Sequence, residues 1–326
     1  MICYKGLDTR LDGPSVVLLG KFDGVHLGHQ YLFHRAKAYA MAHGARCVVV
    51  TFDDHSFSNA LLSLAREKKA LCEEAGMDVL VELEFSAVCD VEAKDFLEDF
   101  LVCHLHGIHM VVGTDCTFGR AIAGNVEFLR NYQNTYGYTV DVVEKLHYNH
   151  HVISSAYIRE CLEQNRLSSV NCMLGRPYHL SGVVVEGRKL GRTLGFPTAN
   201  LMPSTKKILP PYGVYASRIL LEDGRRFFGI TNIGCKPTIS EELCPNVETT
   251  LIDFSEDLYG KEIRVELMEF LRHERKFSSL EELKQQVLQD LSYVKEHSKK
   301  LEQGMNSMIS REKQGILGDD MNGRKN

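Results

Sequence analysis

The sequence predicts an α/β domain with a doubly wound parallel sheet, followed by an antiparallel β-barrel that one helix closes. Three observations support this order. Segments typical of strands and helices alternate through the first half of the chain, short strands separated by Gly and Pro turns fill the second half, and one amphipathic stretch follows the last strand. The length of 326 residues is sufficient for two such domains.

The first half alternates apolar strands with amphipathic helices. Short connections between them favour a parallel sheet, in which ligands bind at the carboxyl ends of the strands. The expected strands are 16–20, 46–52, 79–83, 110–113 and 139–143. The expected helices are 28–43, 61–75, 95–106 and 125–136.

The pattern changes after about residue 175, where short strands separated by turns suggest a barrel. Ser279 and Glu282 can form a capping box that starts the closing helix. We therefore expect domains at 1–175 and 176–297, and a polar tail at 298–326 that is disordered. The expected barrel strands are 180–186, 214–221, 226–233, 248–254 and 263–270. The apolar face of the closing helix consists of Leu283, Val287, Leu291 and Val294.

The composition argues against several classes of partner. A net charge of −5 provides no broad basic surface, so we expect no nucleic-acid partner. No apolar run approaches the length of a membrane span and the first residues do not resemble a signal peptide, so we expect no membrane association. The ten cysteines are scattered without a Cys-x-x-Cys pair, which predicts reduced thiols in a cytoplasmic protein.

The most informative segment is the glycine-rich stretch 20–29, which follows an apolar strand and opens a helix. Backbone N–H groups and the helix dipole at such a turn attract phosphate. His26 and His29 lie three residues apart, face one side of the helix start and can donate hydrogen bonds to phosphate oxygens. Two surface histidines in a tight turn are the alternative interpretation. The nucleotide-binding residues expected in this stretch are Gly20, Phe22, Asp23 and Gly24.

A second phosphate signal ends the first half. Ser154 and Ser155 can cap a helix that begins near residue 156, and their hydroxyls can also face phosphate. Arg159 lies one turn further and offers a planar fork of N–H donors. An ordinary helix cap with a solvated arginine is the alternative interpretation.

The strongest signal of the second half lies at 187–200, which is rich in glycine, basic and small polar residues. Its glycines can wrap phosphates and its basic side chains supply charge. Thr198 and Asn200 lie two apart on an extended segment, so both side chains point to one side, where their oxygens suit Mg²⁺. A basic hairpin loop is the alternative. The nucleotide-binding residues expected here are Gly187, Lys189, Gly191, Arg192, Gly195 and Pro197.

Taken together, these motifs resemble those of the bifunctional prokaryotic riboflavin kinase/FMN adenylyltransferase family, also called FAD synthetase. Residues 17–30 resemble its first nucleotide motif, and 187–200, which ends in Pro-Thr-Ala-Asn, resembles its riboflavin kinase motif. The resemblance implies a nucleotidyltransferase-like first domain and a riboflavin kinase-like barrel. Other segments that resemble family motifs, in the same order, are 51–55, 111–119, 153–159, 211–215, 232–238 and 271–277.

The resemblance also assigns roles to residues that carry no strong signal alone. It implies that Glu248 is the base of the kinase, and the chemistry agrees, because a carboxylate can orient and deprotonate a poorly nucleophilic ribityl hydroxyl. A solvent-facing strand residue is the alternative for a lone Glu. The implied nucleotide contacts are His55, Gly113 and Asp115. The implied flavin contacts are Asn232, Arg272, Glu274 and Phe277.

The implied function is a pair of ATP-dependent reactions. The barrel phosphorylates riboflavin to FMN with Mg²⁺, and the first domain adenylylates FMN to FAD, so the partners are riboflavin, FMN and ATP. Departures from the family pattern at Asp54, Ser56 and Cys116 leave open a riboflavin kinase whose first domain is degenerate. A non-catalytic flavin-binding regulatory protein is the second alternative.

Overall fold

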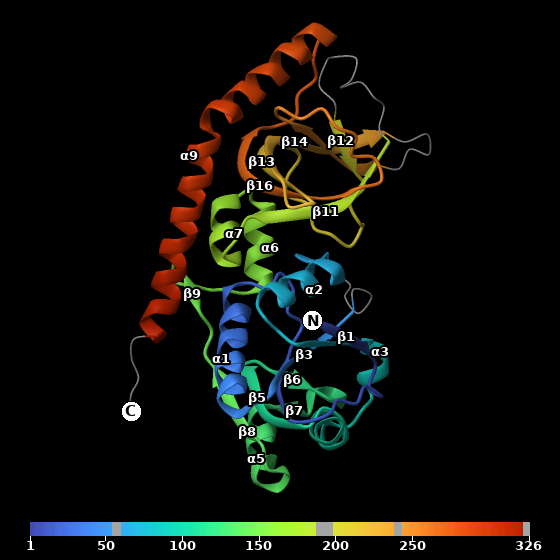
Figure 1. Ribbon diagram of the computed structural model, residues 1–326, viewed down its shortest axis with the longest axis vertical. Coiled ribbons are helices and arrows are strands. Elements are labelled where there is room, and N and C mark those ends of the chain that lie inside the picture. The colour runs from blue at the N-terminus through green and yellow to red at the C-terminus, as the bar shows by residue number, and fades with distance from the viewer. Residues whose placement is uncertain (54–59, 187–197, 238–242, 322–326) are drawn as a thin grey trace. The chain divides into compact units, whose positions relative to one another are not determined.

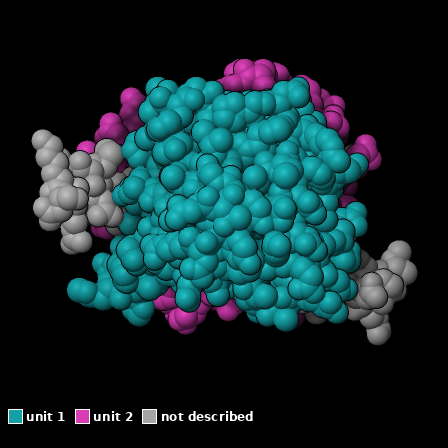
Figure 2. Space-filling model, turned by 90° about the horizontal axis from the view of Figure 1, so that it is seen from below, with its two compact units in different colours: residues 1–155 teal, residues 156–326 magenta. Residues whose placement is uncertain are grey.

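The computed structural model describes residues 1–53, 60–186, 198–237 and 243–321 (Figure 1). Contacts divide the chain into two compact units, residues 1–155 and 156–326, which are coloured separately in Figure 2. The first unit contains a parallel sheet and the second contains a closed antiparallel barrel with a long helix. The predicted fold class is confirmed for both halves.

The sheet of the first unit has six parallel strands in the order β1-β4-β3-β2-β5-β8. The strands are β1 Ile2–Lys5, β2 Ser15–Leu19, β3 Arg46–Phe52, β4 Val79–Leu83, β5 Gly107–Gly113 and β8 Thr139–Val143. The four-residue β1 was missed, because at the edge of the sheet it is largely exposed and carries no buried pattern.

Helices cover the faces of this sheet. Every residue of the central strand β2 is buried, so its side chains are covered on both faces. The helical segments are α1 Leu27–His43, α2 Ala65–Glu74, α3 Phe85–Val88, α4 Ala93–Asp95, η2 Phe96–His104, η3 Arg120–Ile122 and α5 Val126–Tyr136. The short strands of this unit are β6 Thr117–Phe118, β7 Gly124–Asn125, β9 His147–Tyr148 and β10 His151–Val152.

The strand order reverses beside β2. From β2 the chain proceeds through β3 to β4 on one side, and then returns to β5 on the other side of β2. In such sheets the crevice outside the carboxyl ends of the two strands at the reversal binds ligands. The glycine-rich loop follows β2 and Gly113 ends β5, so both predicted nucleotide segments lie at this position.

The second unit begins with α6 and α7 and continues into a barrel closed in the order β11-β12-β15-β14-β13-β16. The two helices are α6 Ser155–Glu163 and α7 Leu167–Leu174. The barrel strands are β11 Tyr178–Val185, β12 Thr198–Leu201, β13 Gly213–Leu221, β14 Arg226–Pro237, β15 Leu243–Leu251 and β16 Glu262–Arg272.

The long helix α9, Leu280–Met321, corrects the prediction that residues from 298 onward are disordered. Met305 and Ile309 are buried with Met268 of β16, and Leu301 packs against the same cluster. Glu302 also forms a 2.5 Å ion pair with Arg218 of β13. These apolar residues recur at helical spacing within an otherwise polar segment, and burial against the barrel stabilises the helix beyond its own propensity.

Contacts divide the chain between residues 155 and 156, whereas the sequence predicted a boundary at 175. The reason is the packing of α7 on the barrel. Asn171 donates to the Leu267 carbonyl of β16 at 3.1 Å, and its side-chain oxygen accepts from the Tyr178 N–H at 2.7 Å. The first of these contacts joins residues far apart in the sequence, so local patterns could not show that α7 packs on the barrel.

Among the described residues, no helix has the length and apolar character that crossing a membrane requires.

Candidate active sites

The glycine-rich loop after β2 holds two non-glycine residues in the left-handed region. Phe22 has φ of 48° and Val25 has φ of 39°, and both side chains are buried. Such conformations cost of order 1–3 kcal/mol each and persist where surrounding contacts impose them, often at binding loops. Gly20 leaves room for the Phe22 ring, since a Cβ there would lie 3.1 Å from it.

The two histidines of the loop lie together at the start of α1. Their rings stack at a centroid distance of 3.6 Å, and the edge of the Phe22 ring packs on His29 at 5.2 Å. His26 is the N-cap residue and is buried, whereas His29 is half-buried. A Cβ at Gly28 would lie 3.2 Å from the His26 ring, so this glycine admits the stack. The pair therefore presents imidazole N–H groups at a helix N-terminus, as predicted.

Asp23 makes contacts that hold the glycine-rich loop in place. Its two carboxylate oxygens accept from the backbone N–H groups of Leu62 and Ser63, at 3.2 and 3.0 Å. The Ser63 hydroxyl in turn accepts from the Gly24 N–H at 2.8 Å. These buried bonds fasten the loop to the segment before α2, so Asp23 shapes the site from within. A direct nucleotide contact by Asp23 or Gly24 stays a prediction.

A buried lysine that sequence reasoning missed lies beside this loop. Lys68 of α2 is 2% exposed, and its ammonium donates to the Phe52 carbonyl at 2.7 Å and to the Thr51 hydroxyl at 3.2 Å. Thr51 donates onward to the Lys21 carbonyl at 3.0 Å. The signal in the sequence is a lysine on the apolar side of an amphipathic helix, next to Leu71 and Cys72.

The serine–arginine motif divides between the two units. The Ser155 hydroxyl donates to the main-chain carbonyl of Asp23 at 2.8 Å, which joins this motif to the glycine-rich loop within the first unit. Ser154 and Ser155 are half-buried. Arg159 is half-buried on α6, which the contacts place with the second unit.

The third predicted nucleotide loop follows β5. Asp115 forms a 2.8 Å ion pair with Lys145, and the Cys116 N–H donates to the Gly113 carbonyl at 3.0 Å. Burial, together with Asp115, raises the pKa of the Cys116 thiol to about 12. A neutral thiol therefore stands where the family resemblance predicts an aromatic residue. The predicted contact His55 lies outside the described residues.

In the barrel, three predicted site residues form a row across neighbouring strands. Glu248 of β15 pairs in register with Asn200 of β12 on one side and with Asn232 of β14 on the other. Directly paired residues of antiparallel strands present their side chains on the same face. The Thr198 hydroxyl donates to Glu248 Oε1 at 2.7 Å. The predicted metal ligands, Thr198 and Asn200, thus lie in one cluster with the predicted base, Glu248.

An open cleft lies beside this cluster. Its walls combine apolar side chains with a few carboxylates. Several of the lining residues lie in the irregular loop after β15. The lining residues are Val184, Thr198, Ala199, Asn200, Leu251, Phe254, Glu256, Asp257, Leu258 and Tyr259.

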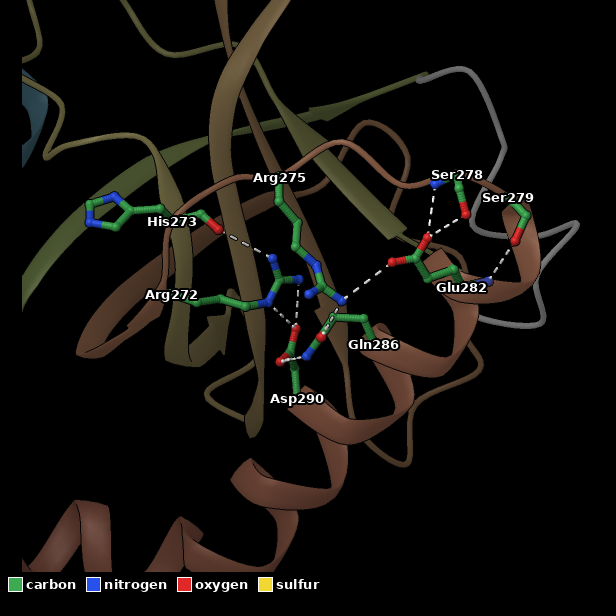
Figure 3. Close-up of polar contacts among 8 residues, drawn as sticks. All are labelled: Arg272, His273, Arg275, Ser278, Ser279, Glu282, Gln286 and Asp290. Carbon is green, nitrogen blue, oxygen red and sulfur yellow. Dashed lines mark hydrogen bonds and ion pairs between the residues drawn. The ribbon is translucent and has the colours of Figure 1, made fainter.

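The predicted flavin contacts lie on β14 and on the segment after β16. Asn232 donates to Glu274 Oε1 at 3.0 Å, and the absence of a side chain at Gly234 makes room for the Glu274 carboxylate. Arg272 donates to Asp290 of α9, as part of the contact network in Figure 3. Its guanidinium also lies over the Phe277 ring. Asn232 therefore links the flavin segment to the row that contains Glu248.

Six predicted nucleotide contacts of the second half fall outside the described residues. They are Gly187, Lys189, Gly191, Arg192, Gly195 and Pro197. Their assignment stays a prediction from the sequence.

Comparisons with protein families match the two halves of the chain to two different enzyme families. Residues 8–157 match the FAD synthetase family and residues 174–298 match the riboflavin kinase family. The chain therefore carries both enzyme domains in the order that the motifs predicted, which does not favour either alternative interpretation.

Curated relatives match nearly the whole chain. A bifunctional riboflavin kinase/FMN adenylyltransferase of Bacillus subtilis is 37% identical over 290 residues, which cover 85% of this chain and 90% of the relative. The proteins of the same name from Haemophilus influenzae and Escherichia coli K12 are 35% and 33% identical, and cover 90% and 89% of this chain and 98% and 96% of their own lengths.

Among solved structures, the fold is similar to that of a Streptococcus pneumoniae protein described as a macrolide-efflux protein. The TM-score is 0.80 at 27% identity, over 90% of this chain and 98% of that protein. This similarity supports the fold of each half. The family assignment rests on the sequence matches. The chain belongs to the bifunctional riboflavin kinase/FMN adenylyltransferase family.

Proposed function

We propose that the barrel transfers the γ-phosphate of ATP to riboflavin at the row that contains Glu248. The ribityl oxygen forms a bond to the γ-phosphorus, the bond from that phosphorus to ADP breaks, and Glu248 accepts the hydroxyl proton. The observation that carries this proposal is the register that aligns Glu248 with Asn200 and Asn232. A polar row next to a cleft provides a place for both the nucleotide and the flavin.

Thr198 and Asn200 fit the proposed Mg²⁺ by their chemistry. Mg²⁺ prefers hard oxygen ligands from one or two side chains together with phosphate oxygens. A hydroxyl that donates its hydrogen to Glu248 keeps its lone pairs for a cation, and Asn200 is 3% exposed on the same strand. When bound, the ion would neutralise charge on the transferred phosphoryl group.

The first unit, in this proposal, transfers AMP from ATP to FMN. A phosphate oxygen of FMN forms a bond to the α-phosphorus, and the bond to pyrophosphate breaks. The FMN phosphate is already ionised, so no protein nucleophile is needed. His26, His29 and Arg159 act by positioning the phosphates and stabilising their charge. The stacked imidazoles at the start of α1 support this assignment.

Product analysis tests the function of both halves. The purified chain is incubated with ATP and Mg²⁺ plus either riboflavin or FMN, and the flavins are separated by chromatography. FAD from both starting flavins is the expected result. FMN from riboflavin without any FAD would reject the adenylyltransferase assignment, and the absence of any product would reject both.

The same proposal places the protein in the cytoplasm, where its substrates are small soluble molecules. The nine cysteines whose side chains the structure describes are free thiols, which suits a reducing compartment.

A further inference from the structure

The N-terminal part of α9 contacts the segment that carries the proposed flavin residues. Glu282, Gln286 and Asp290 lie four residues apart, so they share one face of the helix. In Figure 3 this face is turned toward residues 272–279, which connect β16 to α9, and a continuous series of polar contacts joins the two.

The innermost contact joins Asp290 to Arg272. Arg272 donates from Nε and Nη2 to Asp290 Oδ2, at 3.0 and 2.8 Å, and the other carboxylate oxygen accepts from Gln286 at 2.9 Å. The side chain of Asp290 is 8% exposed and that of Arg272 is 21% exposed. Charge-assisted bonds shielded from water in this way fix a guanidinium in both position and plane.

The outer contacts continue to the start of the helix. Gln286 Oε1 accepts from Arg275 Nη2 at 2.8 Å, and Arg275 lies 3.8 Å from Glu282 Oε1. Glu282 Oε2 accepts from both the N–H and the hydroxyl of Ser278, each at 2.8 Å. The predicted capping box is thus half formed, because Ser279 caps the Glu282 N–H while Glu282 bonds to Ser278 instead.

Besides Arg272, two proposed flavin residues lie on the segment that these contacts hold, Glu274 and Phe277. The guanidinium carbons of Arg275 and Arg272 lie 4.8 and 5.9 Å from the centre of the Phe277 ring, so both cations lie over this ring. Glu274 accepts from Asn232, which lies in register with Glu248. The segment that α9 contacts therefore also bonds, through Glu274, to a strand residue that is paired in register with the proposed base of the kinase.

We propose that Asp290 is a positioning residue of the riboflavin kinase reaction. By fixing Arg272 it holds the segment 272–278, and thereby the geometry that Glu274 and Phe277 present to the flavin. The inference rests on the proposed flavin role of that segment, and extends it to a helix that carries no predicted site residue. Since Asp290 acts through Arg272 and contacts no reacting atom, its loss affects the affinity for riboflavin more than the chemical step.

The test is the variant Asp290→Asn in the full chain. The KM for riboflavin rises by about tenfold, corresponding to about 1.4 kcal/mol, while kcat and the KM for ATP in the kinase reaction stay within about twofold. An unchanged KM for ATP shows that the barrel is folded. Gln286→Leu, which leaves the ion pair of Asp290 intact, gives a smaller rise in the same direction.

The matched control is Glu302→Gln, which breaks another ion pair between the same helix and the barrel, with Arg218. It leaves the KM for riboflavin unchanged if Asp290 acts by positioning. Equal effects of Asp290→Asn and Glu302→Gln, or no effect of Asp290→Asn, overturn the inference.

Two further variants separate this inference from the proposed function. A raised KM for riboflavin in Glu274→Gln and Phe277→Ala, together with a normal KM in Asp290→Asn, rejects only the role of Asp290. A normal KM in both of those variants rejects the flavin assignment of the whole segment.

Discussion

The hydroxyl of Thr198 donates a hydrogen bond of 2.7 Å to Oε1 of Glu248, a residue 50 positions further along the chain. The bond joins the proposed metal ligand to the proposed base. A hydroxyl has one hydrogen to donate and two lone pairs, so the same group can orient the carboxylate and still coordinate a cation. We infer that metal binding and proton acceptance are set by one local geometry.

Replacing Glu248 by Gln keeps the shape of the side chain but removes its basicity. We expect the rate of FMN formation from riboflavin to fall by about 10²–10⁴-fold, the usual contribution of a general base, while ATP binding is nearly unchanged. The measurement is steady-state kinase kinetics with nucleotide binding by calorimetry. Conversion of FMN to FAD by the same variant, and a normal rate in Glu281→Gln, serve as controls. Retained turnover would remove the assignment of Glu248.

Replacing Thr198 by Ala removes both the proposed ligand and the bond to Glu248. The expected result is that the Mg²⁺ concentration needed for half-maximal kinase activity rises at least about tenfold, because one oxygen ligand is lost from a site with few protein ligands. A titration with Mg²⁺ at fixed ATP measures this. Thr198→Ser keeps the hydroxyl and should retain the wild-type requirement. Identical titrations for the two variants would contradict a metal role for this hydroxyl.

Replacing His29 by Ala removes half of the histidine stack at the start of α1. We expect FAD formation from FMN to fall by about 10²–10³-fold, the usual loss for one donor that stabilises developing charge. FMN formation from riboflavin should be unaffected. His34, which is exposed on the same helix, offers a matched control as His34→Ala. Loss of both activities would indicate a folding defect or coupling between the halves.

Replacing Asp23 by Ala leaves the buried N–H groups of Leu62 and Ser63 without their acceptor. An unsatisfied buried donor costs about 1–3 kcal/mol, so the free energy of unfolding should fall by about 2–4 kcal/mol. Denaturant unfolding measures the loss, and substitution of the exposed Asp12 by Ala is the control. A stable variant that is impaired only in FAD formation would instead favour the predicted nucleotide contact.

The barrel should lose stability in mild acid because of His179. Its pKa is lowered well below the usual 6.5, chiefly by burial and further by the cations Lys207, Arg176 and Arg264. Below pH of about 6.5 the unfolded chain binds a proton at this position that the folded chain excludes, so stability declines as the pH falls toward the folded pKa.

Unfolding free energies measured at several pH values test the role of His179. The slope that this group contributes is at most about 1.4 kcal/mol per pH unit, and it should disappear in His179→Gln. The variant can differ from the wild type in overall stability without affecting the test, because the readout is the change with pH. Parallel curves for the two proteins would contradict a buried neutral histidine.

In the barrel half, the strand expected at 248–254 lies at Leu243–Leu251, and α7 was not expected. Elements of the first half were predicted well, because each has a local signature. Strands 46–52, 79–83 and 139–143 were predicted with the bounds that the structure has. Buried strands flanked by amphipathic helices can be predicted from the periodicity of their apolar residues. The edge strand β1 lacks that period, and the predicted helix 61–75 begins only at Ala65, because residues 62 and 63 donate to Asp23 instead of forming a helical turn.

Short sequence motifs identified the candidate site residues. They could not identify the partners with which the side chains of these residues form hydrogen bonds. Asp23 was predicted to bind nucleotide, and the motif did not show that its carboxylate accepts from the segment before α2. Arg272 was predicted to contact flavin, and the motif did not show that its guanidinium binds Asp290, 18 residues away. Glu282, Gln286 and Asp290 recur every four residues, and this spacing places three polar side chains on one face of the helix. Nothing local identified the partner of this face.

By itself, the sequence determined the order of the two folds, the position of the glycine-rich loop, and the residue types that can hold phosphate, metal and proton. These depend on periodicity and on short motifs, in which all the information lies within a few residues. The tertiary structure alone decided that Glu248 lies between Asn200 and Asn232, and that residues 298–321 are helical. Barrel closure and strand register join residues far apart in sequence, and only the packing of the whole unit determines which of them meet.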